Sequence, residues 1–230
     1  MVAILQFPGT NCEKDMQHAY ARLGIESKII WHKEEALPSS CALVVVPGGF
    51  SYGDYLRSGA IARFSPIMRA VSVFAKNGGF VLGICNGFQI LCESGLLPGA
   101  LKRNDNLHFI SQNQTLRVVN TNNAFLQDYA QGALISLPIA HADGSYFADE
   151  TLLKELEQNE QIILRYVKNP NGSISDIAGI CNKEKNVFGL MPHPERAIES
   201  LLGGTDGARM LASIYKVAQN KVSQKAGTQA

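Results

Sequence analysis

Three hydrophobic runs, each followed by a glycine-containing loop and a stretch with helical spacing, limit the possible folds most strongly. They are VAILQF at 2–7, ALVVVPGG at 42–49 and FVLGIC at 80–85. Runs this apolar are typical of central parallel strands, which are buried on both faces. Because parallel strands are joined by helical crossovers, the alternation predicts an α/β fold with a doubly wound sheet and helices on both faces.

The second half of the chain has a different pattern. After about residue 107 the apolar runs are shorter and indicate partly antiparallel strands, with KEKN at 183–186 as a hairpin turn. The sequence thus predicts a mixed sheet. The expected helices lie at about 12–23, 59–77, 86–94, 149–161 and 206–218, and SKIIWH at 27–32 is expected to form a further strand.

Composition narrows the function classes. The 230 residues contain no repeat or linker, which favours a single domain at 1–220 with a disordered tail at 221–230. A net charge of +1 without charged blocks argues against nucleic acid or a membrane surface as the main partner. No basic leader precedes the first strand, and the five cysteines lack metal-ligand spacing, so we expect a cytoplasmic protein with free thiols and no metal site.

The third apolar run ends at a cysteine flanked by glycines, Gly83-Ile84-Cys85-Asn86-Gly87. This spacing has the form of a nucleophile elbow, in which a side chain at either glycine would crowd a strained turn. Sites in parallel sheets form at the carboxyl ends of strands, and the amino end of the following helix favours a thiolate. Taken alone, the pattern predicts either a reactive Cys85 or a plain β–α turn.

A nucleophilic cysteine needs a base and a group that orients this base. The segment MPHPE places His193 and Glu195 two residues apart after a predicted strand, where both side chains can face the same way. The flanking prolines stiffen the segment. By itself the pair would indicate a surface loop, but together with the elbow it predicts a triad of Cys85, His193 and Glu195.

An acyl-transfer site also needs donors for an oxyanion. The amide after an elbow nucleophile is one usual donor, which here is Asn86, and a neighbouring strand–loop junction supplies the other. The junction VVVPGGFSYGD makes Gly49 the second candidate, although its glycines would equally suit a simple turn. Cys12, in the loop after the first strand, is expected at the same edge, but the sequence offers it no partner.

These segments carry a family resemblance. The elbow GICNGFQ, the upstream PGGFSYGDYLRSGA and the downstream PHPE resemble the class I, triad-type glutamine amidotransferases. Within that class, FPGTNC and GGFSYGDYLRSGAIA are similar to the glutaminase subunits of phosphoribosylformylglycinamidine synthase, the PurQ type. The resemblance extends from residue 2 to about 215 and implies a flavodoxin-like fold with a mixed, mostly parallel sheet.

The resemblance also implies roles for individual residues. It makes Cys85 the nucleophile and the PHPE pair its base and orienting group, and it implies that Gln89 contacts substrate glutamine. A loop that begins with His141 and Ala142 would hold the amino-acid end of the substrate. Members usually have H-G-E-G-R-Y there, and this chain departs from that pattern with AHADGSY.

The implied reaction couples two proteins. The glutaminase releases ammonia from glutamine, and a separate synthetase subunit uses ATP and Mg to convert formylglycinamide ribonucleotide to the amidine in purine biosynthesis, with a third small subunit as a possible member. No P-loop motif occurs in this chain, so the ATP chemistry is expected elsewhere and the chain itself needs no cofactor.

Three alternatives stay open at this point. One is a stand-alone γ-glutamyl hydrolase, and another is a cysteine enzyme of the DJ-1/PfpI type, although the residue after the elbow cysteine there is commonly His rather than Asn86. The third is a catalytically silent subunit that only binds and regulates. A glutaminase assay with and without the synthetase chain separates these hypotheses.

Overall fold

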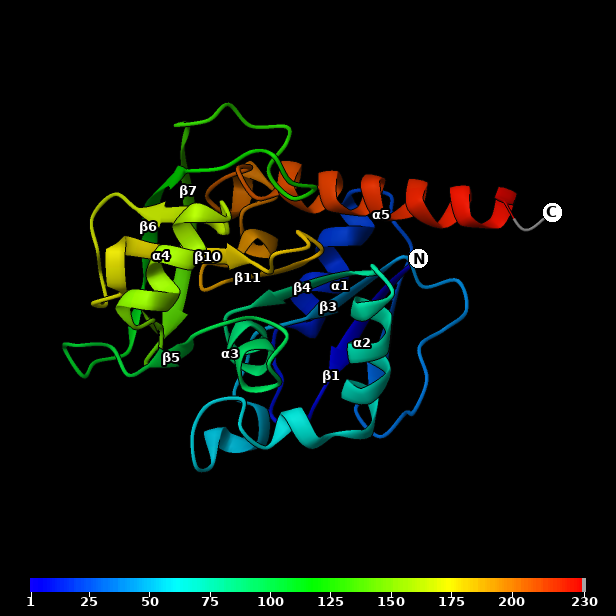
Figure 1. The fold of residues 1–230 in the computed structure, drawn as a ribbon, viewed down its shortest axis with the longest axis horizontal. Coiled ribbons are helices and arrows are strands. Elements are labelled where there is room, and N and C mark those ends of the chain that lie inside the picture. The colour runs from blue at the N-terminus through cyan, green and yellow to red at the C-terminus, as the bar shows by residue number, and fades with distance from the viewer. Residues whose placement is uncertain (229–230) are drawn as a thin grey trace.

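The computed structural model describes residues 1–228, with side chains through residue 224, and most strands form one mixed sheet (Figure 1). Its order is β2-β1-β3-β4-β11-β10-β9-β6-β7, and a separate pair is formed by β5 and β8. The strands are β1 Val2–Gln6, β2 Ser27–Trp31, β3 Leu43–Val46, β4 Phe80–Ile84, β5 Ala100–Lys102, β6 Ile110–Val118, β7 Leu134–His141, β8 Ser145–Phe147, β9 Ile162–Tyr166, β10 Ile177–Cys181 and β11 Val187–Leu190.

The sheet changes character along its length. From β2 to β11 each strand pairs with its neighbour in parallel, whereas β10, β9, β6 and β7 pair in antiparallel fashion. All residues of β3 and β4 are buried, as expected of parallel strands covered on both faces. The predicted mixed α/β sheet is therefore confirmed, including the change of pattern after residue 107.

Helices cover both faces of the parallel half. The helices are α1 Glu13–Arg22, α2 Pro66–Lys76, α3 Asn86–Glu93, α4 Glu150–Gln158 and α5 Ala208–Thr228. Figure 1 shows α1 with α5 on one side of β3 and β4, and α2 with α3 on the other. This is the doubly wound arrangement that the alternation predicts. Among the helices of residues 1–228, none combines the length and apolar character needed to cross a bilayer.

The chain also contains short 3-10 turns, at η1 Ser51–Asp54, η2 Ala62–Phe64, η3 Ile174–Asp176, η4 Pro194–Arg196 and η5 Ser200–Leu202. The helix expected at 59–77 is therefore wrong over residues 59–65. Pro66 restricts the preceding residue to extended conformations, and Ser65 has φ −61° and ψ 142°. The α-helix consequently begins at Pro66, with η2 before it.

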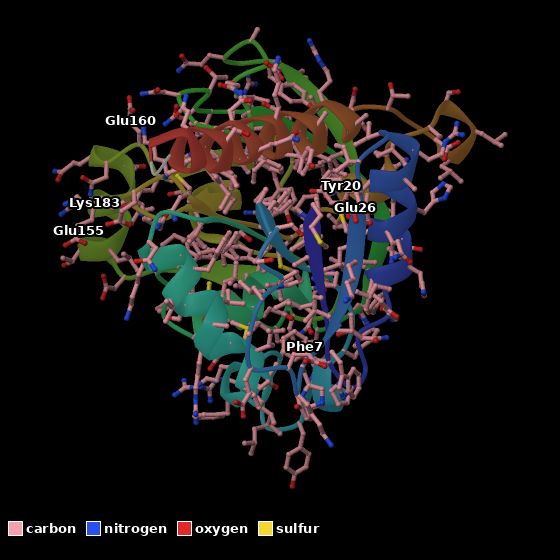
Figure 2. All side chains as sticks on the ribbon, turned by 90° about the vertical axis from the view of Figure 1, so that its right-hand side faces the viewer. Phe7, Tyr20, Glu26, Glu155, Glu160 and Lys183 are labelled. Atoms are coloured by element: carbon pink, nitrogen blue, oxygen red, sulfur yellow. The ribbon has the colours of Figure 1, made fainter. Side chains whose placement is uncertain are left out.

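Two predictions from the sequence concern the surface helix α4 and the closing helix α5. Figure 2 shows Glu155 of α4 on the outside of the molecule, consistent with a charged, solvated face on this helix. Glu160 and Lys183 also lie on the outside, whereas Tyr20 of α1 is fully buried. Helix α5 continues through residues 221–228, where the sequence predicts a disordered tail. Residues 229–230 lie outside the described part, and the domain boundary at 220 stays a prediction.

Candidate active site

Strands β4 and β11 bring two distant sequence motifs together. The two strands run in parallel, with Ile84 opposite Leu190, so both end at the same edge of the sheet. The amide of Cys85 donates to the carbonyl of Leu190 at 2.8 Å, and His193 follows three residues later. Because the site residues come directly after the paired ends, the register of the sheet places the cysteine beside the histidine.

Cys85 has the strained backbone of an elbow. Its φ of 52° and ψ of −110° are unfavourable for a residue with a side chain. The flanking glycines are needed for close packing: a Cβ on Gly87 would lie 1.7 Å from the carbonyl oxygen of Val46, and one on Gly83 would lie 2.8 Å from the backbone of Gly87. Both glycines thus have the steric reason that the G-x-C-x-G pattern predicts.

The Cys85 sulfur lies at the amino end of α3, where Cys85 is the N-cap residue. The residue is 5% exposed, and its Sγ contacts the carbonyl oxygen of Ala140 on β7 at 3.6 Å. The thiol is therefore covered by the antiparallel half of the sheet. A helix amino end beside the sulfur provides partial positive charge toward any negative charge that develops there.

His193 and Glu195 form a buried pair, with relative exposures of 1% and 2%. His193 Nδ1 donates to Glu195 Oε1 at 2.6 Å, and the amide of His193 donates to the carbonyl of Pro138 on β7 at 2.8 Å. The segment is not extended as expected for residues at a strand end, because η4 begins at Pro194, whose φ suits the first position of a helical turn. The two side chains nevertheless meet.

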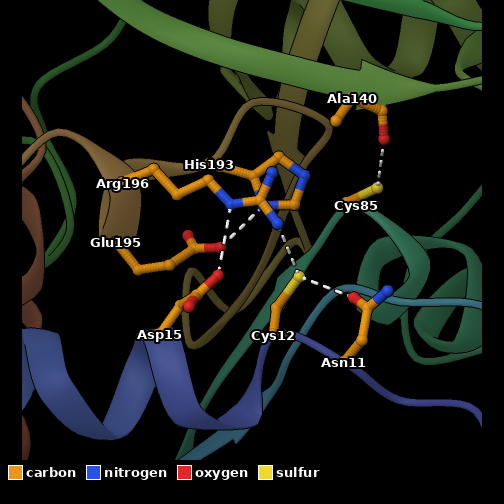
Figure 3. A network of polar contacts seen from close by, with 8 residues as sticks. All are labelled: Asn11, Cys12, Asp15, Cys85, Ala140, His193, Glu195 and Arg196. Atoms are coloured by element: carbon orange, nitrogen blue, oxygen red, sulfur yellow. Dashed lines mark hydrogen bonds and ion pairs between the residues drawn. The ribbon is translucent and has the colours of Figure 1, made fainter. Parts of the chain in front are cut away.

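The charges around His193 favour its protonated form. Burial by itself would lower the pKa of His193, but the charges of Glu195 and Cys85 hold this pKa well above its usual value. Figure 3 shows the imidazole ring between Glu195 and Cys85. Among the described residues, no hydrogen bond is formed by the buried Nε2. A nitrogen that faces a thiol while its other nitrogen is held by a carboxylate can exchange a proton with that thiol.

The two oxyanion candidates come from the segments that follow β3 and β4. Asn86 is the first residue of α3, and its side chain accepts a hydrogen bond from the amide of Ser51 at 3.1 Å, which links the elbow to η1. Gly49 has φ 145°, and a Cβ there would lie 2.7 Å from the amide nitrogen of Asn11. Only glycine fits this conformation without strain. The backbone at Gly49 is thus suited to the predicted role, and its amide stays a predicted oxyanion donor.

Gly48 is a site residue that was not singled out from the sequence. A Cβ on Gly48 would lie 2.8 Å from the His193 ring, 3.1 Å from the Cys12 sulfur and 3.4 Å from the Cys85 Cβ. Because Gly48 has no side chain, the side chains of His193, Cys12 and Cys85 can approach one another beside it. The doubled glycine in PGGF was the available signal, but it did not distinguish the two positions.

The predicted substrate-binding residues do lie together. Gln89 donates from Nε2 to the backbone carbonyl of Asp143, so helix α3 meets the loop that begins with His141 and Ala142. The buried Asn104 holds this loop through hydrogen bonds to the carbonyl and to Nδ1 of His141. Asn104 was not found from the sequence, where it stands in an ordinary polar segment.

Two groups in this loop region have shifted pKa values. Burial, with a smaller contribution from His193, lowers the pKa of His141 to about 4. Burial and the nearby charge of Asp143 raise the pKa of Asp54 to about 6, against a lowering by the Ser58 hydroxyl. His141 is consequently neutral at pH 7, whereas the pKa of His193 is shifted in the opposite direction.

Cys12 also reaches the site, as expected from its loop, and it does have partners. Its sulfur accepts a hydrogen bond from Arg196 Nη2 at 3.1 Å (Figure 3). Ligand atoms of Cys12, His193 and Glu195 lie within 4.8 Å of one another, close enough for a metal ion. A cation at that position would have to displace the guanidinium from the sulfur and compete with the His193–Glu195 hydrogen bond, so the geometry does not favour a metal.

Comparison with known proteins gives the family context. A profile of the CobB/CobQ-like glutamine amidotransferase domain matches residues 1–204. A protein of Helicobacter hepaticus named phosphoribosylformylglycinamidine synthase subunit PurQ is 66% identical over 220 residues, which cover 96% of this chain and 99% of the relative. The PurQ subunit of Campylobacter jejuni is 59% identical over 210 residues, covering 91% of this chain and 93% of the relative.

Solved structures agree with these sequence relationships. A chain in the structure of PurLQS from Thermotoga maritima superposes with a TM-score of 0.86 at 41% identity, over 94% of this chain and 97% of that one. A glutamine amidotransferase from the same organism superposes with a TM-score of 0.56 at 14% identity, over 98% of this chain and 84% of that one. The second similarity indicates a shared fold only.

Proposed function

The chain belongs to the CobB/CobQ-like glutamine amidotransferase family, and from this premise we propose that it is the glutaminase subunit of phosphoribosylformylglycinamidine synthase. It hydrolyses glutamine to glutamate and ammonia and supplies the ammonia to a synthetase subunit in purine biosynthesis. The observation that carries the chemistry is the buried arrangement of Cys85, His193 and Glu195 where β4 and β11 end, with His193 as the N-cap of η4 and Glu195 within it.

The first half-reaction forms a thioester. The thiol proton of Cys85 first passes to Nε2 of His193, whose surroundings favour the protonated ring, and the sulfur then attacks the side-chain carbonyl carbon of glutamine. The C–N bond of the tetrahedral intermediate then breaks, and His193 returns that proton to the leaving nitrogen, which departs as ammonia. Glu195 holds the ring at Nδ1 and stabilises the imidazolium that exists between these two transfers.

The second half-reaction hydrolyses the thioester. His193 takes a proton from water, the hydroxide oxygen bonds to the acyl carbon, and the C–S bond breaks to release glutamate while the proton returns to the sulfur. The amides of Gly49 and Asn86 donate to the oxyanion in both halves, and Gln89 with the loop at His141 and Ala142 holds the substrate. The contact between Gln89 and Asp143 supports a single binding wall made of α3 and this loop.

The partner follows from the named relatives. The Helicobacter hepaticus relative is a subunit of phosphoribosylformylglycinamidine synthase, and the Thermotoga maritima structure is titled PurLQS. We assign the same assembly to this chain, with one synthetase partner and a third small subunit. ATP and Mg are used by the synthetase, which converts formylglycinamide ribonucleotide, and the complex works in the cytoplasm.

Docking of the synthetase is expected to activate the site. Ammonia released into neutral water becomes ammonium, which is no nucleophile. A free chain with low glutaminase activity therefore does not consume glutamine without a synthetase to use the ammonia. The loop after Gly49 has exposed side chains at Phe50, Tyr55 and Leu56, and its Ser51 amide is bonded to the Asn86 side chain. A partner that contacts this loop can therefore move the amides of Gly49 and Asn86, and a shift of about 1 Å in such donors can change the reaction rate on the order of a hundredfold.

Reconstitution tests the proposed function. The chain alone is expected to hydrolyse glutamine slowly, and addition of synthetase, ATP and formylglycinamide ribonucleotide should raise the rate strongly. Cys85→Ala should abolish glutamine-dependent synthesis but leave ammonia-dependent synthesis, with Cys92→Ala as the matched control. Full-rate hydrolysis by the chain alone would favour a stand-alone hydrolase. No hydrolysis in any mixture would favour a silent subunit.

A further inference from the structure

A second cysteine and an arginine lie behind the His193–Glu195 pair. Cys12 is the N-cap residue of α1, is 1% exposed, and is the residue that the proposed mechanism leaves unused. Its thiol donates to Asn11 Oδ1 at 3.1 Å, while its sulfur accepts from Arg196 Nη2, also at 3.1 Å. The other side of the guanidinium is held by Asp15, whose Oδ2 accepts from Arg196 Nε at 3.3 Å.

This position is close to an unpaired carboxylate oxygen. The Cys12 sulfur lies within 4.8 Å of a Glu195 oxygen, and Glu195 Oε2 is buried without a hydrogen-bond partner among the described residues. A buried carboxylate oxygen without a donor is costly, and a guanidinium fits carboxylates particularly well. The hydrogen bond from Arg196 to the Cys12 sulfur therefore competes with a possible hydrogen bond from Arg196 to Glu195 Oε2.

We propose that Cys12 is a positioning residue that holds the Arg196 guanidinium away from Glu195, so that the charge of Glu195 stays available to His193. Without the sulfur, Nη2 loses its acceptor and turns toward Glu195 Oε2. The carboxylate then shares its charge with a permanent cation, and its stabilisation of the His193 imidazolium weakens. This inference rests on the proposed function only in assigning proton transfer to His193.

The consequence is a lower pKa for His193 when Cys12 is removed. Groups that face His193 or its partner from the packed elements must be considered together. They are Glu195 and Arg196 on η4, Cys85 at the β4–α3 turn, His141 at the end of β7, and Cys12, Asp15 and Tyr20 on α1. Of these, Arg196 loses its sulfur acceptor when Cys12 is removed, and this route differs from the direct contribution of Cys12 to the raised pKa of His193, which does not depend on position 196.

A histidine titration by NMR tests the inference without relying on activity. The chain contains five histidines, and the signal of His193 is assigned by its loss in His193→Gln. Cys12→Ala should lower the pKa of His193 by about one unit, which corresponds to a tenfold change in its proton affinity. Cys12→Ser should leave the titration unchanged, because its hydroxyl still accepts from Arg196.

A double-mutant cycle separates this role from simple packing. In the reconstituted complex, Cys12→Ala should reduce glutamine-dependent kcat roughly tenfold when Arg196 is present, and less than about twofold in the Arg196→Gln background. The titration shift should likewise become smaller in that background, where only the direct contribution of Cys12 remains. Cys92→Ala is the matched control and should behave alike with either residue at position 196.

Several results would overturn the inference. Equal losses in the two backgrounds would mean that Cys12 acts by packing, and a serine variant as impaired as the alanine variant would exclude the acceptor role. An unshifted His193 titration in Cys12→Ala would have the same meaning. If the wild-type complex lacked glutamine-dependent activity, the proposed function would fail, whereas the titration would still decide the role of Cys12.

Discussion

The two sides of the candidate site are built in opposite ways. On the triad side, Cys85, His193 and Glu195 are almost completely buried, and neighbouring glycines are in tight contact with backbone atoms. On the loop side, residues 50–57 expose Phe50, Tyr55 and Leu56, and a Cβ on Gly53 would meet nothing within 4 Å. The candidate triad is thus held by close packing, whereas the exposed loop at 50–57 has room to move.

The two buried histidines of the site differ in their charged neighbours. His193, on the triad side, has a carboxylate at 2.6 Å, and its pKa is raised. His141, at the end of β7, is buried against Asn104, forms no ion pair with a carboxylate among the described residues, and has a pKa lowered to about 4. Similar burial therefore accompanies pKa shifts in opposite directions, and the difference lies in the neighbouring anion.

The largest expected effect concerns the triad side. His193→Ala should reduce glutamine-dependent synthesis by roughly 10⁴-fold or more, because no other described group can carry the proton between Cys85 and the leaving nitrogen. Glu195→Ala should cost less, since the ring keeps its amide anchor to Pro138. Steady-state kinetics of the complex provide the measurement. Equal losses in the two variants would contradict the assignment of proton transfer to His193 and of a supporting role to Glu195.

Glycine replacements compare the packing of the two sides directly. Gly87→Ala places a Cβ 1.7 Å from the Val46 carbonyl oxygen and should lower the free energy of unfolding by about 3 kcal/mol or more. Gly53→Ala has free space, and its φ of 66° should cost only about 1 kcal/mol. Urea unfolding of both variants measures the difference. Similar values would contradict the contrast between a tight elbow and an open loop.

The neutral His141 predicts a dependence of stability on pH. Its folded pKa of about 4 lies below the usual 6.5, so protonation favours the unfolded state as the pH falls through this range. The free energy of unfolding should lose about 3 kcal/mol between pH 7 and pH 4 relative to His141→Gln. Urea titrations of wild type and variant at several pH values give this difference. A constant difference would mean that His141 does not titrate as its burial implies.

The smallest effect is expected at Asp54, on the loop side. Its pKa of about 6 means that the ionised form opposes folding above pH 6, and that this cost disappears as the pH falls toward 4. Asp54→Asn should therefore stabilise the chain at pH 7 by about 1 kcal/mol, a value reduced for the partial exposure of the side chain. Thermal unfolding at pH 7 and pH 4 provides the test. A variant that is destabilised at pH 7 would argue that Asp54 has an unrecognised cationic partner.

Much of the fold, and the proximity of the three triad candidates, could be predicted because the relevant signals are local. Buried strands are encoded by short apolar runs, the elbow by glycines two residues on either side of Cys85, and the base pair by one H-x-E segment. The helix start at 59–66 was missed although its cause, Pro66, is also local. The helical spacing of the apolar residues outweighed the conformational restriction that a proline imposes on its predecessor.

By itself the sequence determined the class of fold, the elbow and the identity of the triad candidates, since each depends on residues within a few positions of one another. Only the tertiary structure decided which other side chains share the site. Arg196 and Cys12 are 184 positions apart, and Asn104 and His141 are 37 positions apart. Such contacts leave no periodic or spaced pattern in the chain, because they arise from the order and register in which the strands pair.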